Sequence, residues 1–266
     1  MGKKVFCKSC GSKSLWKVRR NRLKCSKCRK EFSRRKFGGL SLSDYQWKKI
    51  IQWFVLEQSI LKIQEQTTVS KYFVIKALLI LRRLMLADVP KTFKGIVEID
   101  ETYLGGQMKN RRIKERIKIN IDGKKKSGFG TIKQPVFGIL CRSGQVWAEL
   151  INKTEAIDLQ PIIQRKVKKG STICTDTWRG YTGIAAKGYV HRLVNHGKQE
   201  YSDKKGGHIN GLEGFWGYLK RKLAAKGGIR KSRLHLYLGE YVWRYNHRRL
   251  NVKEQVKYLL NLVAKI

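Results

Sequence analysis

The sequence predicts an α/β protein with a mixed five-stranded sheet and flanking helices, preceded by two smaller N-terminal segments. Three observations predict this architecture. Two Cys-x-x-Cys pairs lie near the N-terminus, apolar residues then recur at the helical period, and short apolar runs beyond residue 90 end on acidic residues. We expect domains at residues 1–36, 37–90 and 91–266.

The N-terminal cysteines are spaced like metal ligands. Cys7 and Cys10 form one pair, Cys25 and Cys28 form the other, and 14 residues separate the pairs. Each pair can offer two thiolates to one tetrahedral ion, and a hairpin of residues 15–18 and 22–24 would bring the pairs together. The spacing therefore predicts a zinc ribbon whose folding depends on structural Zn²⁺. A redox-active cysteine pair is the alternative, which the presence of two pairs disfavours.

Residues 37–90 show a helical pattern. We expect helices at residues 43–55, 60–64 and 71–86, with Ser41 or Ser43 as the first cap. A short helix, a tight turn at residues 67–70 and a longer helix are typical of a helix-turn-helix, in which the last helix reads DNA. Because residues 71–86 are rich in apolar side chains, a helical hairpin that only packs on the next domain remains the alternative.

The rest of the chain alternates strands with helices. We expect strands at residues 96–101, 136–141, 146–151, 172–176 and 189–194, and helices at 155–167, 210–223 and 234–247. The order of one strand, a hairpin, a helix and another strand predicts a mixed sheet. Cys141 and Cys174 lie within these apolar strands, where we expect them to be small core side chains.

Charge indicates the partner. The chain of 266 residues has 59 Lys and Arg against 19 Asp and Glu, which gives a formal net charge of +40. A compact protein with this charge repels itself unless it works against a polyanion, so we expect DNA or RNA as the partner. We find no apolar run of about 18 residues and no signal peptide, so we expect no membrane contact and a cytoplasmic, nucleoid-associated protein.

Acidic residues at the ends of apolar strands indicate a metal site. Asp100 and Asp176 end two strands, and Glu213 follows the start of a helix. We expect these three carboxylates to hold two Mg²⁺ or Mn²⁺ ions about 4 Å apart around a scissile phosphate. Glu98 shares the face of Asp100 but lies deeper, and Glu101 points to the opposite face, so Asp100 is the preferred ligand. The alternative is that Asp100 and Asp176 only cap helices or turns.

The third ligand has two candidates. Asn210 and Glu213 lie one helical turn apart, so either side chain can face the same ion. A third carboxylate offsets more of the charge of two divalent ions, which favours Glu213 and leaves Asn210 to cap the helix.

Basic residues near these acids are candidate DNA contacts. Lys220 lies two helical turns beyond Glu213, where its ammonium can meet a phosphate. Lys124 and Lys125 belong to a basic stretch at residues 109–133, which we expect to contact DNA. Arg244 and Arg248 alternate with aromatic residues in a pattern that suits a DNA surface, although core packing explains the aromatic residues equally well.

Several motifs together resemble a known family. They are Ile99–Gly106, Thr175–Asp176 with Tyr181, His208–Trp216 with Lys220 and Arg221, and Tyr245–Arg248. In this order, after the cysteine pairs, they resemble the DDE transposases of bacterial insertion sequences that carry an N-terminal zinc ribbon and an ISXO-like transposase domain. The basic stretch at residues 109–133 has no close counterpart in this pattern.

The resemblance implies more than the residues show alone. It implies an RNase H-like catalytic domain at residues 91–266 that binds terminal inverted repeats, cleaves DNA and joins the 3′ ends to target DNA as a homo-oligomer. It also implies DNA contact by His208, Asn210 and Arg221, and some relatives use the Asn as the third ligand. The alternatives are a zinc-ribbon transcription factor, which leaves the acidic residues without a role, and an RNase H-like nuclease or resolvase.

Overall fold

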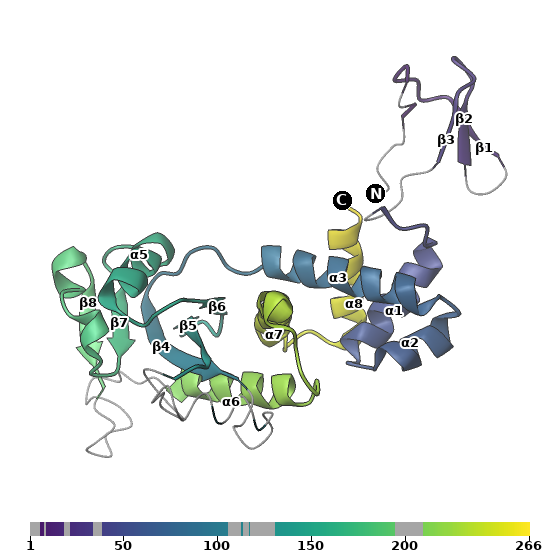
Figure 1. The fold of residues 1–266 in the computed structure, drawn as a ribbon. Coiled ribbons are helices and arrows are strands. Elements are labelled where there is room, and N and C mark those ends of the chain that lie inside the picture. The colour runs from purple at the N-terminus through teal and green to yellow at the C-terminus, as the bar shows by residue number, and fades with distance from the viewer. Residues whose placement is uncertain are drawn as a thin grey trace. The chain divides into compact units, whose positions relative to one another are not determined.

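The computed structural model describes residues 6–7, 9–18, 22–33, 39–105, 113, 117, 131–194 and 210–266. The chain divides into two compact units (Figure 1): Met1–Leu81 with Val252–Ile266, and Arg82–Asn251. The division falls within helix α3, and the C-terminal helix groups with the N-terminal residues. Sequence patterns placed a boundary at residue 90 and did not single out that helix.

The first part of the N-terminal unit is a small antiparallel sheet. It consists of β1 (Leu15–Val18), β2 (Arg22–Cys25) and β3 (Glu31–Ser33), in that order. The predicted hairpin is confirmed, because Leu15 pairs with Cys25. The third strand is an addition to the prediction, and it pairs Phe32 with Leu23 on the far side of β2.

The helices of this unit include two that begin at serine caps. They are α1 (Asp44–Val55), α2 (Ile60–Thr67), α3 (Lys71–Ala87) and α8 (Val252–Val263). Ser43 forms a capping box with Gln46 at the start of α1, and Ser59 caps α2. Thr68 adopts a left-handed conformation that ends α2, so the chain turns tightly into α3. Helix α8 packs against α1.

The second unit contains the predicted five-stranded sheet. Its strands lie in the order β6-β5-β4-β7-β8, and their bounds are Ile96–Leu104 (β4), Gln134–Cys141 (β5), Val146–Leu150 (β6), Thr172–Thr175 (β7) and Val190–Leu193 (β8). The central strand β4 is antiparallel to β5 and parallel to β7. This order and these directions are those of an RNase H-like sheet.

Helices cover both faces of the sheet (Figure 1). They are α5 (Ala156–Lys166), α6 (Asn210–Ala224) and α7 (Leu234–Asn246), with short 3₁₀ turns η3 (Arg179–Tyr181), η4 (Ala185–Lys187) and η6 (Lys231–Arg233). One apolar cluster joins Val97 and Ile99 of β4 to α5. A second joins β5 and β6 to α6 and α7. Because β4 side chains alternate between these clusters, its odd-numbered residues face α5 and its even-numbered residues face α6.

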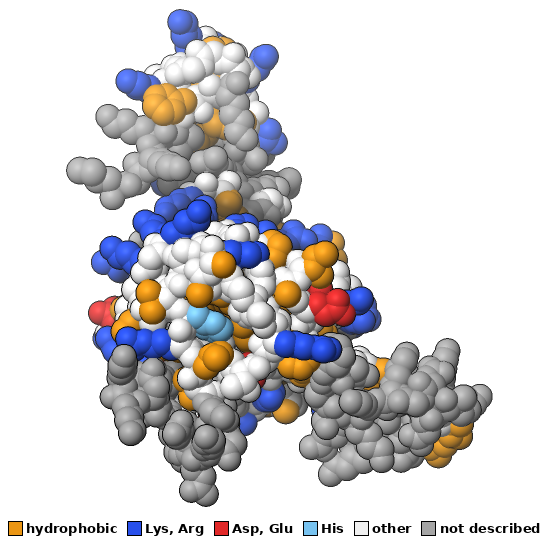
Figure 2. All heavy atoms as spheres, turned by 90° about the vertical axis from the view of Figure 1, so that its left-hand side faces the viewer, with side chains coloured by type: hydrophobic (Ala, Val, Ile, Leu, Met, Phe, Trp, Pro, Cys, Tyr) orange, Lys and Arg blue, Asp and Glu red, His pale blue; other side chains and the backbone are white. Residues whose placement is uncertain are grey.

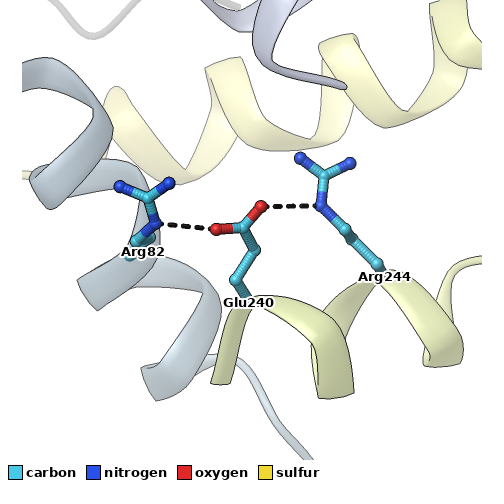
Figure 3. Close-up of polar contacts among 3 residues, drawn as sticks. All are labelled: Arg82, Glu240 and Arg244. Atoms are coloured by element: carbon cyan, nitrogen blue, oxygen red, sulfur yellow. Dashed lines mark hydrogen bonds and ion pairs between the residues drawn. The ribbon is translucent and has the colours of Figure 1, made fainter. Parts of the chain in front are cut away.

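A buried ion triad joins the end of α3 to α7 (Figure 3). The carboxylate of Glu240, 1% exposed, accepts from Arg82 Nε at 2.7 Å and from Arg244 Nε at 2.9 Å. Arg244 is itself only 8% exposed. The expected contact between Arg244 and DNA is therefore wrong for this structure, because its guanidinium is buried against a carboxylate. Core packing, the alternative for the aromatic residues of this segment, describes Trp243, which is fully buried.

Within the described part of the chain, no helix combines the length and the apolar character needed to span a membrane.

Candidate active site

Asp100 lies on the central strand, under helix α6. The indole N–H of Trp216 donates to Asp100 Oδ2 at 3.0 Å. Gly138 is the cross-strand partner of Asp100, and a Cβ atom there would lie 2.4 Å from Cζ2 of Trp216. A glycine at this position therefore lets the indole approach the sheet closely enough to reach Asp100. Sequence patterns showed Trp216 only as part of the apolar stripe of its helix.

Glu98 lies deeper on the same face and holds the beginning of α6. Its side chain is 1% exposed, and Oε2 accepts from the backbone N–H of Leu212 at 2.8 Å. A Cβ atom at Gly211 would lie 2.9 Å from Glu98 Oε2, so glycine permits this contact. Asn210 is the first residue of α6, and the N–H of Leu212 bonds to Glu98. A remote carboxylate therefore binds one of the N–H groups at the start of α6, and capping by Asn210 stays a prediction.

Asp176 directly follows β7, which runs parallel to β4. Glu98 pairs with Cys174, so Asp100 and Asp176 each lie two residues beyond this pair at the same end of the sheet. Asp176 Oδ1 accepts from the backbone N–H of Trp178 at 3.0 Å. One carboxylate oxygen of Asp176 therefore caps the turn that follows β7.

Glu213 lies in the first turn of α6 and is exposed. It precedes Trp216 by three residues, so both side chains lie on neighbouring positions of the helix surface. Burial and, less strongly, the negative charges of Asp176 and Glu213 raise the pKa of Asp100 to about 6, although the N–H groups of Glu101 and Trp216 act in the opposite direction. The three predicted carboxylates therefore share one electrostatic environment.

Glu101 points to the opposite face, as strand alternation predicts. Its Oε1 accepts a hydrogen bond from the hydroxyl of Tyr181, which is fully buried. Burial raises the pKa of Glu101 to about 8, and the charges of Asp100 and Asp176 contribute to the increase. The Tyr181 contact links two of the motifs noted in the sequence, but neither motif alone shows that they meet.

Hard divalent cations suit this group of acids. Mg²⁺ and Mn²⁺ prefer carboxylate oxygens, and a cation would offset the repulsion that raises the pKa of Asp100. Among the described residues, the tightest set of possible metal ligands is the cysteine cluster, so the three acids are more widely spaced than those thiols. A cavity of 380 Å³ elsewhere in this unit is lined by Trp147, Lys166 and Leu238 among others, and none of the three acids lines it.

The four cysteines fit a zinc ion. Their sulfur atoms all lie within 4.8 Å of one another, with Cys7 and Cys28 at 3.5 Å and Cys10 and Cys25 at 3.6 Å. Tetrahedral zinc with bonds of about 2.3 Å places its sulfur ligands about 3.8 Å apart. The predicted ribbon geometry is therefore present.

The residues predicted to contact DNA differ in their exposure and in their side-chain partners. Lys220 and Arg221 are exposed on α6, and Asn210 is exposed at its start. Arg248 is exposed, but its guanidinium lies over the ring of Tyr245 and donates to the carbonyls of Gly144 and Tyr245. His208, Lys124 and Lys125 lie outside the described residues.

A mixed sheet of this order, with Asp100 within its central strand and Asp176 directly after the neighbouring parallel strand, defines an RNase H-like α/β protein. Residues 92–246, more than half of the chain, match the model of the ISXO2-like transposase domain, and the chain belongs to that family. An uncharacterized transposase-like protein of Haemophilus influenzae is 34% identical over 119 residues, which make up 45% of this chain and 94% of that protein. The family resemblance seen in the motifs is thereby confirmed.

Proposed function

We propose that this protein is a DDE-type transposase of an insertion sequence, which binds terminal inverted repeats, cleaves DNA and joins the 3′ ends to target DNA. One arrangement carries the proposal. The parallel register of β4 and β7 puts Asp100 and Asp176 at the same level, and α6, which carries Glu213, is attached to β4 through Glu98 and Trp216. This arrangement supports a site to which each of three elements contributes one acid.

Asp100, Asp176 and Glu213 would hold the divalent ions. Bound ions of this kind supply an activated oxygen nucleophile and stabilise the leaving oxygen in phosphoryl transfer. Asp100 lies within β4, Asp176 directly follows β7, and Trp216 orients one oxygen of Asp100. Lys220, two turns after Glu213 on α6, presents an ammonium group to a phosphate on the same side.

DNA recognition is assigned to the N-terminal unit. The left-handed Thr68 and the buried Val69 form a tight turn before α3. The first turns of α3 then expose Lys71, Tyr72 and Lys76, with Tyr72 60% exposed and the Lys76 ammonium 4.3 Å from its ring centroid. In a helix-turn-helix, the N-terminal residues of the second helix reach base edges.

The charge of the chain supports a polyanionic partner. The formal net charge is +40, and Figure 2 shows Lys and Arg side chains spread over one face with few acidic groups. We propose double-stranded DNA at both the element ends and the target, zinc in the N-terminal ribbon, and a homo-oligomer that holds two ends together. Because such binding releases counterions, the DNA-binding constant should fall as salt is added. The logarithm of this constant should change with the logarithm of salt concentration by a slope of about −0.9 for each neutralised phosphate.

The test is Mn²⁺- or Mg²⁺-dependent cleavage and strand transfer on DNA that carries the element's own terminal repeats. Glu213→Gln should abolish cleavage and leave DNA binding intact, whereas Asn210→Ala should leave measurable cleavage. Glu149→Gln removes an exposed carboxylate of the same unit and serves as the control. The reverse result, with cleavage kept by Glu213→Gln and lost by Asn210→Ala, would move the third ligand to Asn210.

Two other functions predict different outcomes. A zinc-ribbon transcription factor would bind DNA without cleaving it, and a nuclease or resolvase would cleave without joining 3′ ends. Inverted repeats around the gene, flanked by short direct repeats of host DNA, would support transposition over both.

A further inference from the structure

The turn that follows Asp176 is attached to the strand that carries Asp100. We infer that Tyr181 and Glu101 form a clamp that sets the spacing between Asp100 and Asp176, an inference that rests on the proposed function. In this clamp, Tyr181 and Glu101 are positioning residues, and they do not themselves bind the ions or the DNA.

One hydrogen bond connects the two halves of the site. Glu101 directly follows Asp100 on β4, and Tyr181 lies five residues after Asp176 in the short turn η3. The Tyr181 hydroxyl donates to Glu101 Oε1, and the tyrosine is fully buried. A displacement of the turn relative to β4 would break this bond. The bond therefore resists changes in the distance between Asp100 and Asp176.

The remainder of the turn is held against the α5 side. The indole N–H of Trp178 donates to the carbonyl of Thr154 at 2.8 Å. The Gln160 amide donates to the carbonyl of Thr182 at 2.9 Å. A Cβ atom at Gly180 would lie 2.8 Å from the Trp178 indole nitrogen, so the turn is also closely packed. Several contacts therefore hold the turn in place, and the hydrogen bond from Tyr181 attaches β4 to it.

The side of the sheet on which Glu101 lies separates it from the reacting groups. Glu101 faces the cluster that contains Val97, Ile99 and Tyr181, whereas Asp100 faces Trp216 on the other side of β4. Its oxygen accepts from a buried tyrosine within that layer. A hydrogen-bond acceptor at this position is what the clamp needs, and a negative charge is not.

A clamp is needed because the two aspartates repel each other. Like charges near one another favour separation, and metal ligands reach their geometry through supporting contacts. If Tyr181 and Glu101 hold the spacing before ions bind, less of the binding free energy is used to order the site.

The test compares Tyr181→Phe, Glu101→Gln and Glu101→Ala in the full chain with zinc retained. Mn²⁺ affinity is measured by calorimetric titration, folding by circular dichroism, and DNA cleavage as a function of Mn²⁺ concentration. We expect Tyr181→Phe and Glu101→Ala to weaken Mn²⁺ binding by about tenfold or more, as loss of a supporting contact does at other metal sites. High Mn²⁺ should then restore much of their cleavage. Glu101→Gln keeps an acceptor oxygen and should stay close to the unchanged protein.

Tyr189→Phe is the matched control. Its hydroxyl donates to the carbonyl of Val167 in the same apolar cluster, away from the turn, so its loss should leave Mn²⁺ affinity unchanged. Unchanged Mn²⁺ affinity in Tyr181→Phe would overturn the clamp. Glu101→Gln as defective as Glu101→Ala would also overturn it, because the carboxylate itself would then be required. The proposed function fails separately, if the unchanged protein has no Mn²⁺ site that Asp176→Asn removes.

Discussion

Trp216 and Asp100 are joined by a hydrogen bond of 3.0 Å from the indole N–H to a carboxylate oxygen, although 116 residues separate them in the chain. This bond attaches α6 to the central strand one turn beyond Glu213. A second attachment, from Glu98 to the Leu212 N–H, lies at the beginning of the helix. Two contacts with one strand determine both the position and the rotation of α6, and so the direction in which Glu213 points.

Gly138→Ala should disturb this arrangement. The new methyl group would lie 2.4 Å from the Trp216 ring, so the ring must move away from Asp100. We expect a loss of about 1–3 kcal/mol in the free energy of unfolding and weaker Mn²⁺ binding. Gly214→Ala is the control, because nothing lies within 4 Å of a Cβ atom there and alanine favours a helix. Equal stability of the two variants, measured by urea denaturation, would show that the ring has room to move.

Glu98→Ala should loosen the start of α6. It leaves the buried N–H of Leu212 without this acceptor, which costs about 1–3 kcal/mol. Hydrogen–deuterium exchange should become faster in the first turn of α6, and metal-dependent cleavage should fall with it. Glu98→Gln keeps an acceptor oxygen and should show a smaller effect. Unchanged exchange in Glu98→Ala would contradict the assignment of Glu98 as the anchor of this helix.

The pH dependence of stability should report on Asp100. Folding raises its pKa from 3.8 to about 6, so the metal-free fold favours the protonated form. This contribution to the free energy of unfolding is present below the unfolded pKa and is lost as the pH rises through about 6. Mn²⁺ should reverse the loss above that pH, since it binds the carboxylate. Melting temperatures across this range, with and without Mn²⁺, check the prediction. Asp100→Asn should reduce both the loss of stability with rising pH and its reversal by Mn²⁺. An unchanged pH profile in this variant would show that Asp100 is not the group responsible.

Glu240→Ala should be strongly destabilising. It leaves the guanidinium groups of Arg82 and Arg244 buried without their shared carboxylate, and removal of one member of a buried ion pair costs about 3–5 kcal/mol. The exposed pair of Lys62 and Glu65 provides the comparison, because Glu65→Ala should cost about 0–1 kcal/mol. Similar denaturation midpoints for the two variants would mean that water reaches the arginines.

Cys25→Ser should release zinc and weaken DNA binding while the sheet of the second unit stays folded. Three thiols hold the ion less well than four, and zinc supplies much of the stability of so small a module. Zinc content and affinity for the terminal repeats are the measurements. Cys141→Ser, outside the cluster, should change neither. Full zinc content and unchanged binding in Cys25→Ser would exclude the ribbon as a zinc-dependent DNA module.

The sequence by itself determined the features that depend on short stretches of chain. Cysteine spacing predicted the ribbon, and apolar periodicity with Ser43 predicted α1 close to its observed bounds. The same patterns predicted all five strands of the main sheet. Parallel strands with acids predicted that Asp100 and Asp176 lie at the same level of the sheet, and the register of β4 and β7 agrees. The expected end of the first strand at its acids is wrong, because β4 continues past Asp100 to Leu104 in its pairing with β5.

Only the tertiary structure decided which partners the buried polar groups have. Periodicity showed that α7 has a buried face, but the burial of Arg244 depends on Glu240 and on Arg82, which is 158 residues away from Glu240. The role of Glu98 depends on a backbone N–H 114 residues away. A helical or strand repeat records burial along one element, whereas a hydrogen bond between remote elements depends on how both are packed. For that reason the acids could be named from the sequence, and the contacts that hold them in place could not.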